Sequence, residues 1–300
     1  MKAWLVVNAF LQQKKFQEIY QWLYEACKEK KIDIQMHTNQ DLYMYIKNSR
    51  LELCEQVQEV AFVLFWDKDV ILAKTLEALG FQIYNSAFSI EACDNKSLTH
   101  LYLANKGIAM PDTIAAPMTY ANIGYTNLEF VEEVVDALGL PLVVKESFGS
   151  FGQQVYLCHT KEEVIEQTKQ LAGKSFLYQK YIVAAAGKDM RLQVVGNRVV
   201  AAMERTAKAG DFRANITNGG SMRMYTPSQE ECAMAIAACK YLQASFAGVD
   251  LFYGEGKRPM VCEVNSNAHF KNIYDCTGVN CANAIVDYIY TCVEKNGRNR

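Results

Sequence analysis

The chain has 300 residues, half of them apolar and 21% charged, with a formal net charge of −2. This length exceeds one typical domain, and the charge balance excludes a general basic surface, so we expect no nucleic-acid partner. No apolar run is long enough to cross a bilayer, and the first residues lack the long apolar segment of a signal peptide. We therefore expect a cytoplasmic protein without a membrane partner.

The first ninety or so residues are expected to form a small doubly wound α/β domain. Apolar runs typical of buried parallel strands alternate there with helical patterns, and one of these helices ends at Gly80. The expected strands are 3–7, 32–37, 60–66 and 81–85, and the expected helices are 15–30 and 67–80.

The pattern changes from Ser89 onward, where helices and hairpins predominate. One continuous helix is expected over 89–107, followed by an extended loop at 110–118. Further helices are expected at 127–139, 161–173, 228–246 and 280–294. The expected strands lie within 140–159, at 175–182, in a hairpin at 188–208 that turns at Gly196-Asn197, and in a second hairpin at 247–267.

Ten cysteines and four histidines are scattered along the chain, and no Cys-x-x-Cys pair occurs. A zinc site needs tighter ligand spacing. We interpret the cysteines as reduced thiols in a cytosolic interior, with a redox pair of Cys276 and Cys281 as the weaker alternative.

The second hairpin carries a group of oxygen ligands. Glu263 and Asn265 point to the same face of one strand because side chains alternate, and Asp250 lies on the strand expected opposite. Carboxylate and amide oxygens together with phosphate suit Mg²⁺. The alternative is an acidic pair on a solvated strand face, which the neighbouring apolar residues Val249 and Val264 disfavour.

Basic residues and a glycine loop occur on other strands. Lys145 ends an apolar strand and is followed by a loop with Gly149 and Gly152, whose amides can cradle phosphate. Dense basic residues within and after the strand 188–195 suit phosphate or a developing anion, although an exposed, salt-bridged hairpin edge fits them equally well. These residues are Arg191, Arg205, Lys208 and Arg213.

Taken in order, these segments resemble the ATP-grasp superfamily, and specifically RimK-like ATP-dependent carboxylate–amine ligases. The similarity runs from about Phe62 to Cys281 and is closest in DMRLQVVGNRVVAAMERTAKAGDFRANITNGG. It implies an α/β fold, α+β overall: an N-terminal doubly wound pre-ATP-grasp domain at 1–95, a central lid at 96–185 and a C-terminal antiparallel-sheet catalytic domain at 186–300.

The resemblance also implies roles for individual positions. ATP would be bound by Lys96, Lys145, the loop Gly149, Ser150, Phe151 and Gly152, the adenine hinge Gln179, Lys180, Tyr181 and Ile182, the ribose-binding Asp189, and Arg213 and Asn215. Arg205 and Lys208 are the implied catalytic residues, and Arg191, Asn267 and His269 are expected to contact substrate. Asp250, Glu263 and Asn265 resemble ligands of a pair of Mg²⁺ ions, with Mn²⁺ as an alternative.

Two segments depart from the family pattern. The hinge reads Gln-Lys-Tyr instead of Gln-Glu-Tyr, which leaves backbone recognition of adenine intact. Relatives commonly continue after the last metal ligand with a small residue and then Ser-Pro-Gly, whereas this chain has Ser266 followed by residues 267–271. That loop is expected to border the substrate, so the change concerns the substrate. His269 is either a base or carboxylate ligand there, or a loop histidine in water.

The implied activity joins a carboxylate to an amine through an acyl phosphate, with release of ADP and phosphate. The amine would be an amino acid, commonly glutamate, and the carboxylate a peptide, a protein C-terminus or a small molecule. Relatives also imply a homo-oligomer. The alternatives are a phosphotransferase on the same scaffold and a non-catalytic nucleotide-binding module, which the combination of Lys145, Asp250, Glu263 and Asn265 disfavours.

Overall fold

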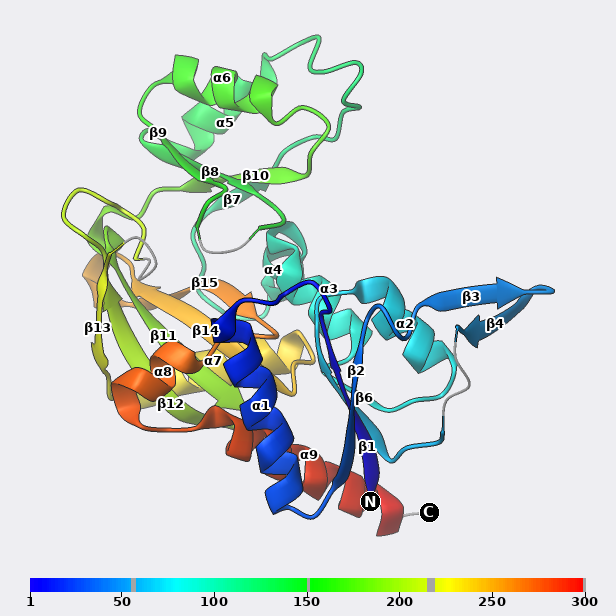
Figure 1. Cartoon of the computed structure of the whole chain (residues 1–300). Coiled ribbons are helices and arrows are strands. Elements are labelled where there is room, and N and C mark those ends of the chain that lie inside the picture. Colours follow the sequence, from blue (N-terminus) through cyan, green and yellow to red (C-terminus); the bar gives the residue numbers. More distant parts are fainter. Residues whose placement is uncertain (55–57, 150–151, 215–218, 299–300) are drawn as a thin grey trace.

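A computed structural model of the protein describes residues 1–54, 58–149, 152–214 and 219–298. Its three larger sheets follow one another along the chain, within residues 2–84, 113–180 and 188–265. Figure 1 shows the middle unit standing above the other two, which lie side by side. None of the helices in the described ranges is long and apolar enough to cross a membrane.

The first sheet is parallel, with strand order β2-β1-β5-β6. Its strands are β1 (Lys2–Val7), β2 (Asp33–Thr38), β5 (Phe62–Trp66) and β6 (Ile83–Tyr84). Alternate residues of β1 enter different cores, since Leu5 packs with α1 (Lys14–Glu29) and α9 (Cys281–Arg298) while Trp4 packs with α2 (Val70–Ala78). Helices on both faces explain the continuous apolar strands and confirm the predicted doubly wound fold.

A hairpin interrupts this domain where no element was predicted. It pairs β3 (Met44–Lys47) with β4 (Arg50–Leu53) and projects away from the main sheet (Figure 1). Its sequence carries no two-residue Asn-Gly or Asp-Gly turn, which is the strongest short-range hairpin signal.

The single helix predicted over 89–107 is wrong. The structure has α3 (Ala87–Asp94) and α4 (Lys96–Leu103), separated at Asn95 by an extended backbone with φ −98° and ψ 106°. The Asn95 side chain caps α4 by accepting from the amides of Ser97 and Leu98. The break places Lys96 in the first turn of a new helix, at the edge of the cavity described below.

The central sheet is antiparallel, with order β7-β10-β8-β9, and α5 (Phe130–Leu138) and α6 (Lys161–Gln170) pack against it. The expected extended loop at 110–118 contains a short strand, because residues 113–115 pair with β10. The strands are β7 (Thr113–Ala115), β8 (Leu142–Glu146), β9 (Val155–Cys158) and β10 (Phe176–Lys180).

The C-terminal sheet is antiparallel, with order β13-β12-β11-β14-β15. One face is covered by α7 (Gln229–Tyr241), and part of the other packs against α8 (Lys271–Thr277) and α9. Both predicted hairpins are confirmed. The strands are β11 (Lys188–Val195), β12 (Arg198–Thr206), β13 (Ser221–Met224), β14 (Phe246–Tyr253) and β15 (Pro259–Asn265).

Candidate active site

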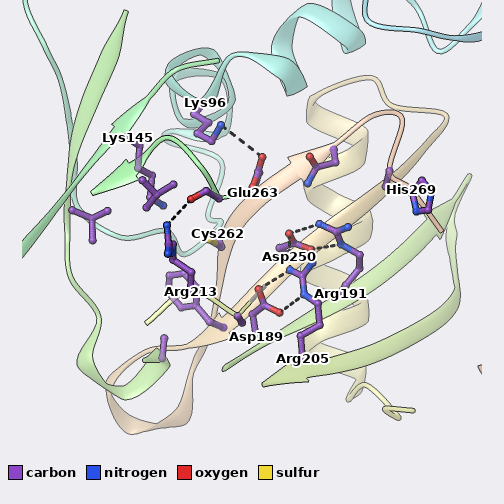
Figure 2. Close-up of a pocket in the computed structure, with 18 of the residues that line it drawn as sticks. Lys96, Lys145, Asp189, Arg191, Arg205, Arg213, Asp250, Cys262, Glu263 and His269 are labelled. Atoms are coloured by element: carbon purple, nitrogen blue, oxygen red, sulfur yellow. Dashed lines mark hydrogen bonds and ion pairs between the residues drawn. The ribbon is translucent and has the colours of Figure 1, made fainter. Parts of the chain in front are cut away.

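A cavity of about 550 Å³ is lined by residues of all three units. Its C-terminal wall is the polar part of the sheet face that α7 does not cover, and Figure 2 shows its charged side chains converging. The predicted site residues that line it are Lys96, Lys145, Gly152, Gln179, Lys180, Tyr181, Ile182, Asp189, Arg191, Arg205, Arg213, Asp250, Glu263, Asn265, Asn267 and His269.

Two predicted residues within the described ranges, Gly149 and Lys208, are not among those lining the cavity. Lys208 is exposed and does not contribute to the wall, so the structure gives its catalytic role no support. Gly149 does not line the cavity itself, although its carbonyl accepts a hydrogen bond from Lys96 Nζ at 3.2 Å. Ser150, Phe151 and Asn215 lie outside the described residues.

The hairpin of β14 and β15 brings the three expected oxygen ligands together. Asp250 lies opposite Glu263, and Gly248 lies opposite Asn265. The register shifts beside Asp250, so Cys262 is an extra residue on β15 and both it and Glu263 face the cavity. Strict alternation did not predict this bulge. Burial raises the pKa of the Cys262 thiol to about 11, which keeps it protonated and unreactive at neutral pH.

Two arginines bind the acidic residues at the centre of the sheet face. Arg191 donates to both oxygens of Asp250 at 2.6 Å, and Arg205 donates to both oxygens of Asp189 at 2.6 Å. Arg205 also approaches Asp250 at 2.9 Å, which joins the pairs into one network (Figure 2). Both arginines thus keep a nearly fixed orientation, because planar bidentate pairing fixes geometry as well as charge.

The network shifts the pKa values of its two carboxyl groups in opposite directions. Burial alone raises the pKa of Asp250, but the charges and hydrogen bonds of Arg191 and Arg205 bring it below its usual value. Burial raises the pKa of Asp189 to about 6, and the charge of Arg205 only partly opposes this. Asp250 therefore remains a carboxylate at neutral pH, held between two guanidinium groups.

Glu263 and Asn265 are much less constrained than Asp250. The only charged contact of Glu263 within the described part of the chain is Lys96 Nζ at 3.9 Å. Asn265 Nδ2 is buried and has no hydrogen-bond partner there. The donor set therefore fits Mg²⁺: the Glu263 carboxylate has little competition and the Asn265 amide carries a second oxygen, whereas Asp250 would share its carboxylate with the arginines. No cluster of three or more His, Cys, Asp or Glu side chains suited to a metal occurs in the described residues.

Gln179 organises the opposite wall. Its Oε1 accepts from Lys145 Nζ at 2.6 Å, and its Nε2 donates to Thr113 Oγ1 at 2.9 Å and to His100 Nε2 at 3.0 Å. Burial, assisted by the Lys145 charge, lowers the pKa of His100 to about 4, so its ring is neutral and can accept this bond. The network fixes the Lys145 ammonium group at the cavity wall.

The N-terminal unit supplies a wall that the sequence interpretation missed. Asn8 follows β1 and Asp67 follows β5, and both line the cavity together with Tyr20 and Trp66. A signal was present, because polar residues just beyond the carboxyl ends of parallel strands in a doubly wound sheet commonly face a ligand.

The loop after Asn265 contacts this N-terminal wall. Asn267 Nδ2 donates to the Asp67 carbonyl at 2.6 Å, and His269 Nε2 lies 2.8 Å from the Lys15 carbonyl. His269 is partly buried against Phe16, so it is not a histidine in bulk water. Burial lowers its pKa despite the opposing hydrogen bond to the Lys15 carbonyl, and the charges of Lys15 and Arg191 lower it further.

Comparison with known families identifies a match to a family described as a RimK-like ATP-grasp domain, covering residues 93–289. A "Probable alpha-L-glutamate ligase 2" of Hahella chejuensis is 34% identical over 230 residues, covering 76% of this chain and 72% of the relative. "Beta-citrylglutamate synthase B" of Danio rerio is 26% identical over 302 residues, covering 96% of this chain and 73% of the relative.

Solved structures share the fold at low sequence identity. The D-cycloserine synthetase DcsG superposes with a TM-score of 0.74 at 15% identity, covering 98% of this chain and 100% of DcsG. The ATP-grasp ligase PsnB, solved with a phosphomimetic precursor variant, Mg and ADP, gives a TM-score of 0.69 at 15% identity, covering 97% of this chain and 98% of PsnB. These similarities confirm the predicted ATP-grasp fold.

Proposed function

The chain belongs to the RimK-like ATP-grasp family, whose members are ATP-dependent carboxylate–amine ligases, and on that premise we propose that it joins an amino acid such as glutamate to a carboxylate through an acyl phosphate. The carboxylate would belong to a peptide, a protein C-terminus or a small molecule. The names of the glutamate-ligase and citrylglutamate-synthase relatives support an amino-acid substrate.

One observation carries the proposal: a single cavity between the three units brings lysine, arginine and acidic side chains into one space. Lys96 and Lys145 enter from α4 and β8, whereas Arg205, Asp250 and Glu263 stand on the C-terminal sheet (Figure 2). Cations on one side suit a triphosphate, and the oxygen ligands suit its counter-ion.

The reaction would proceed in two balanced steps. A carboxylate oxygen of the substrate attacks the γ-phosphorus of ATP, the bond from that phosphorus to the bridging oxygen breaks, and ADP leaves. The amine nitrogen then attacks the acyl carbon, the carbon–oxygen bond to phosphate breaks, and phosphate departs with the electron pair. The nitrogen loses a proton, and an amide remains.

Positioning and charge stabilisation are the protein's main contributions. Lys96 and Lys145 would hold phosphate oxygens, with Lys145 fixed by Gln179. Arg205 has an Nη1 group outside its two carboxylate contacts, which would stabilise negative charge in the acyl phosphate and the tetrahedral intermediate. The hinge residues Gln179 to Ile182, which line the cavity, would recognise adenine through their backbone.

Glu263 and Asn265, with Asp250 shared, would hold Mg²⁺. When bound there, Mg²⁺ would supply positive charge that offsets the charge of the phosphates. The PsnB structure with Mg and ADP supports this general requirement within the same fold. The number of ions, and whether Mn²⁺ substitutes, remain predictions to be tested by metal titration.

An ADP-release screen of amino acids against candidate carboxylates and peptides tests the function. The expected result is release of ADP and free phosphate only when both a carboxylate and an amine are present, with an amide in the product mass. Phosphate found on the acceptor would instead identify a phosphotransferase. Nucleotide binding without turnover over the whole screen would identify a non-catalytic module.

A further inference from the structure

One end of the cavity has no role in the ATP chemistry proposed above. Its walls are Asn8, Tyr20, Trp66 and Asp67 from the N-terminal unit and Asn267 from the loop after β15. None of the residues proposed to bind ATP precedes Lys96 in the chain, so none of them belongs to the N-terminal unit. This end is therefore available to another substrate.

Asp67 places a carboxyl group in this end of the cavity. It is 7% exposed, and its Oδ1 accepts from Lys68 N at 2.7 Å and from Asn8 Nδ2 at 3.1 Å. Its Oδ2 accepts only from Asn8, at 3.2 Å, as far as the described residues show. Burial raises the Asp67 pKa, and these hydrogen bonds oppose the shift. A carboxylate oxygen can accept two hydrogen bonds, so Oδ2 keeps acceptor capacity.

No lysine or arginine in the described wall forms an ion pair with Asp67, although the charge of Lys68 acts to lower the Asp67 pKa. The Lys68 ammonium group pairs with Asp94, and the Arg191 guanidinium pairs with Asp250. The Tyr20 hydroxyl group is close enough for the Asp67 charge to act on it: burial, and then Asp67, raise the Tyr20 pKa to about 12. Tyr20 thus remains a neutral phenol beside the carboxylate.

A second acceptor lies next to Asp67. Asn267 Nδ2 donates to the Asp67 backbone carbonyl at 2.6 Å, which fixes the side chain against the N-terminal wall. The other end of this amide, Oδ1, is buried and has no partner within the described chain. Buried polar atoms are nearly always hydrogen-bonded to protein, water or a ligand, and Asn267 lines the cavity, so a ligand bound there can supply the donor that Oδ1 lacks.

A ligand that fits these groups must donate hydrogen bonds and carry positive charge. An ammonium group has three donors and no acceptor, which matches the free capacity of Asp67 Oδ2 and Asn267 Oδ1. Aromatic rings of Tyr20 and Trp66 line the same end, and such rings favour a cation. A carboxylate ligand would instead meet the Asp67 charge.

We propose that Asp67 and Asn267 form the subsite that binds the ammonium group of the amine substrate. The inference rests on the proposed ligase function and specifies which part of the cavity receives the amine. It also gives the loop after Asn265 a role, because this loop carries Asn267.

Tryptophan fluorescence of the full-length protein with ADP and Mg²⁺ tests the subsite without requiring turnover, since Trp66 lines it. The probes are the common L-amino acids and the N-acetyl derivative of each. We expect a saturable signal with at least one free amino acid and none with its N-acetyl derivative. Asp67→Asn, which keeps the size of the side chain, should weaken binding about 10- to 100-fold, the range for a hydrogen bond to a charged group.

Asn267→Ala provides a second variant. It should weaken binding of the same amino acid more than it weakens binding of ADP. Trp66→Phe identifies the source of the signal, and Asp287→Asn, in an exposed ion pair on α9, is the matched control that should bind normally. The proposal is overturned if no free amino acid binds to the wild type, if N-acetylation has no effect, or if folded Asp67→Asn and Asn267→Ala bind as the wild type does.

An assay with hydroxylamine distinguishes a wrong subsite from a wrong ligase assignment. Hydroxylamine traps an acyl phosphate as a hydroxamate and carries no other group for the amine subsite to recognise. A failed ligase assignment gives no hydroxamate with wild-type protein over the carboxylate screen. If only the subsite is wrong, the wild-type protein forms the hydroxamate, but Asp67→Asn binds the amino acid as well as the wild type does.

Discussion

Asp250 and Glu263 lie directly opposite each other on β14 and β15, but the protein holds them differently. Asp250 is buried between Arg191 and Arg205, whereas Glu263 meets only the distant ammonium group of Lys96 among charged groups of the described residues. Neutralising Asp250 and neutralising Glu263 should therefore affect the stability of the protein differently.

Glu263→Gln should separate catalysis from stability. The Lys96 contact at 3.9 Å is part-exposed and should stabilise the fold by under about 1 kcal/mol, so unfolding should change little. ADP release at fixed Mg²⁺ should fall by at least ~10²-fold, because the metal that offsets the phosphate charge loses one of its ligands. Denaturant titration measures the first effect, and an Mg²⁺ titration of ADP release measures the second. Full activity in this variant would show that Glu263 is not a metal ligand.

Arg205→Ala should lose stability as well as activity. The sequence alone suggested loss of rate with an intact fold, but the structure shows Arg205 bound to Asp189 and Asp250. Removing it leaves buried carboxylates uncompensated, which typically costs about 3–5 kcal/mol, in addition to a rate loss of ~10²–10³-fold. Arg223→Ala is the matched control, since it removes an exposed Arg–Glu pair on β13 and should change neither quantity much. Normal turnover by folded Arg205→Ala would refute its role.

Gln179→Met should weaken ATP binding through Lys145. The variant deprives Lys145 Nζ of its 2.6 Å acceptor and leaves Thr113 and His100 without their Gln179 donor. We expect the KM for ATP to rise about tenfold, with about 1–3 kcal/mol of stability lost to unpaired groups. Gln170→Met, on the exposed face of α6, is the control. An unchanged KM for ATP would show that the position of Lys145 does not depend on Gln179.

His100 should make the protein less stable in mild acid. Its pKa is about 4 in the folded protein, against an ordinary histidine value of 6.5, so the unfolded state binds more protons between these values. Stability should therefore rise with pH across this window, by about 3 kcal/mol in total, and fall as pH drops. His100→Asn should flatten this part of the curve, whereas His159→Asn, at an exposed position, should not. Unfolding titrations at several pH values provide the measurement.

The sequence revealed the C-terminal hairpin well because its signals are local. Strand alternation placed Glu263 and Asn265 on one face, and the hairpin placed Asp250 on the strand opposite them, as the structure confirms. The bulge at Cys262 was not predictable, because an extra residue in one strand leaves no composition signal.

Contacts between distant segments could not be derived from local patterns. Asp189 and Arg205 are paired across β11 and β12, but their alternation gives no sign that Arg205 also reaches Asp250 on β14. The N-terminal wall had a local signal in Asn8 and Asp67, which follow parallel strands, but no local pattern shows that this edge of the sheet meets the other two units. The break at Asn95 had a local signal, since asparagine is a strong N-cap, but the helical pattern on both sides concealed it.

The last helix has a consequence for biosynthesis. α9 packs against α1, and its Ile285 and Ile289 belong to the same core as Leu5 of β1. The first sheet therefore lacks part of its cover until Cys281–Arg298 have been synthesised and have left the ribosome. A nascent chain would expose that apolar face until α9 is made, so β1 reaches its final packing long after its own synthesis.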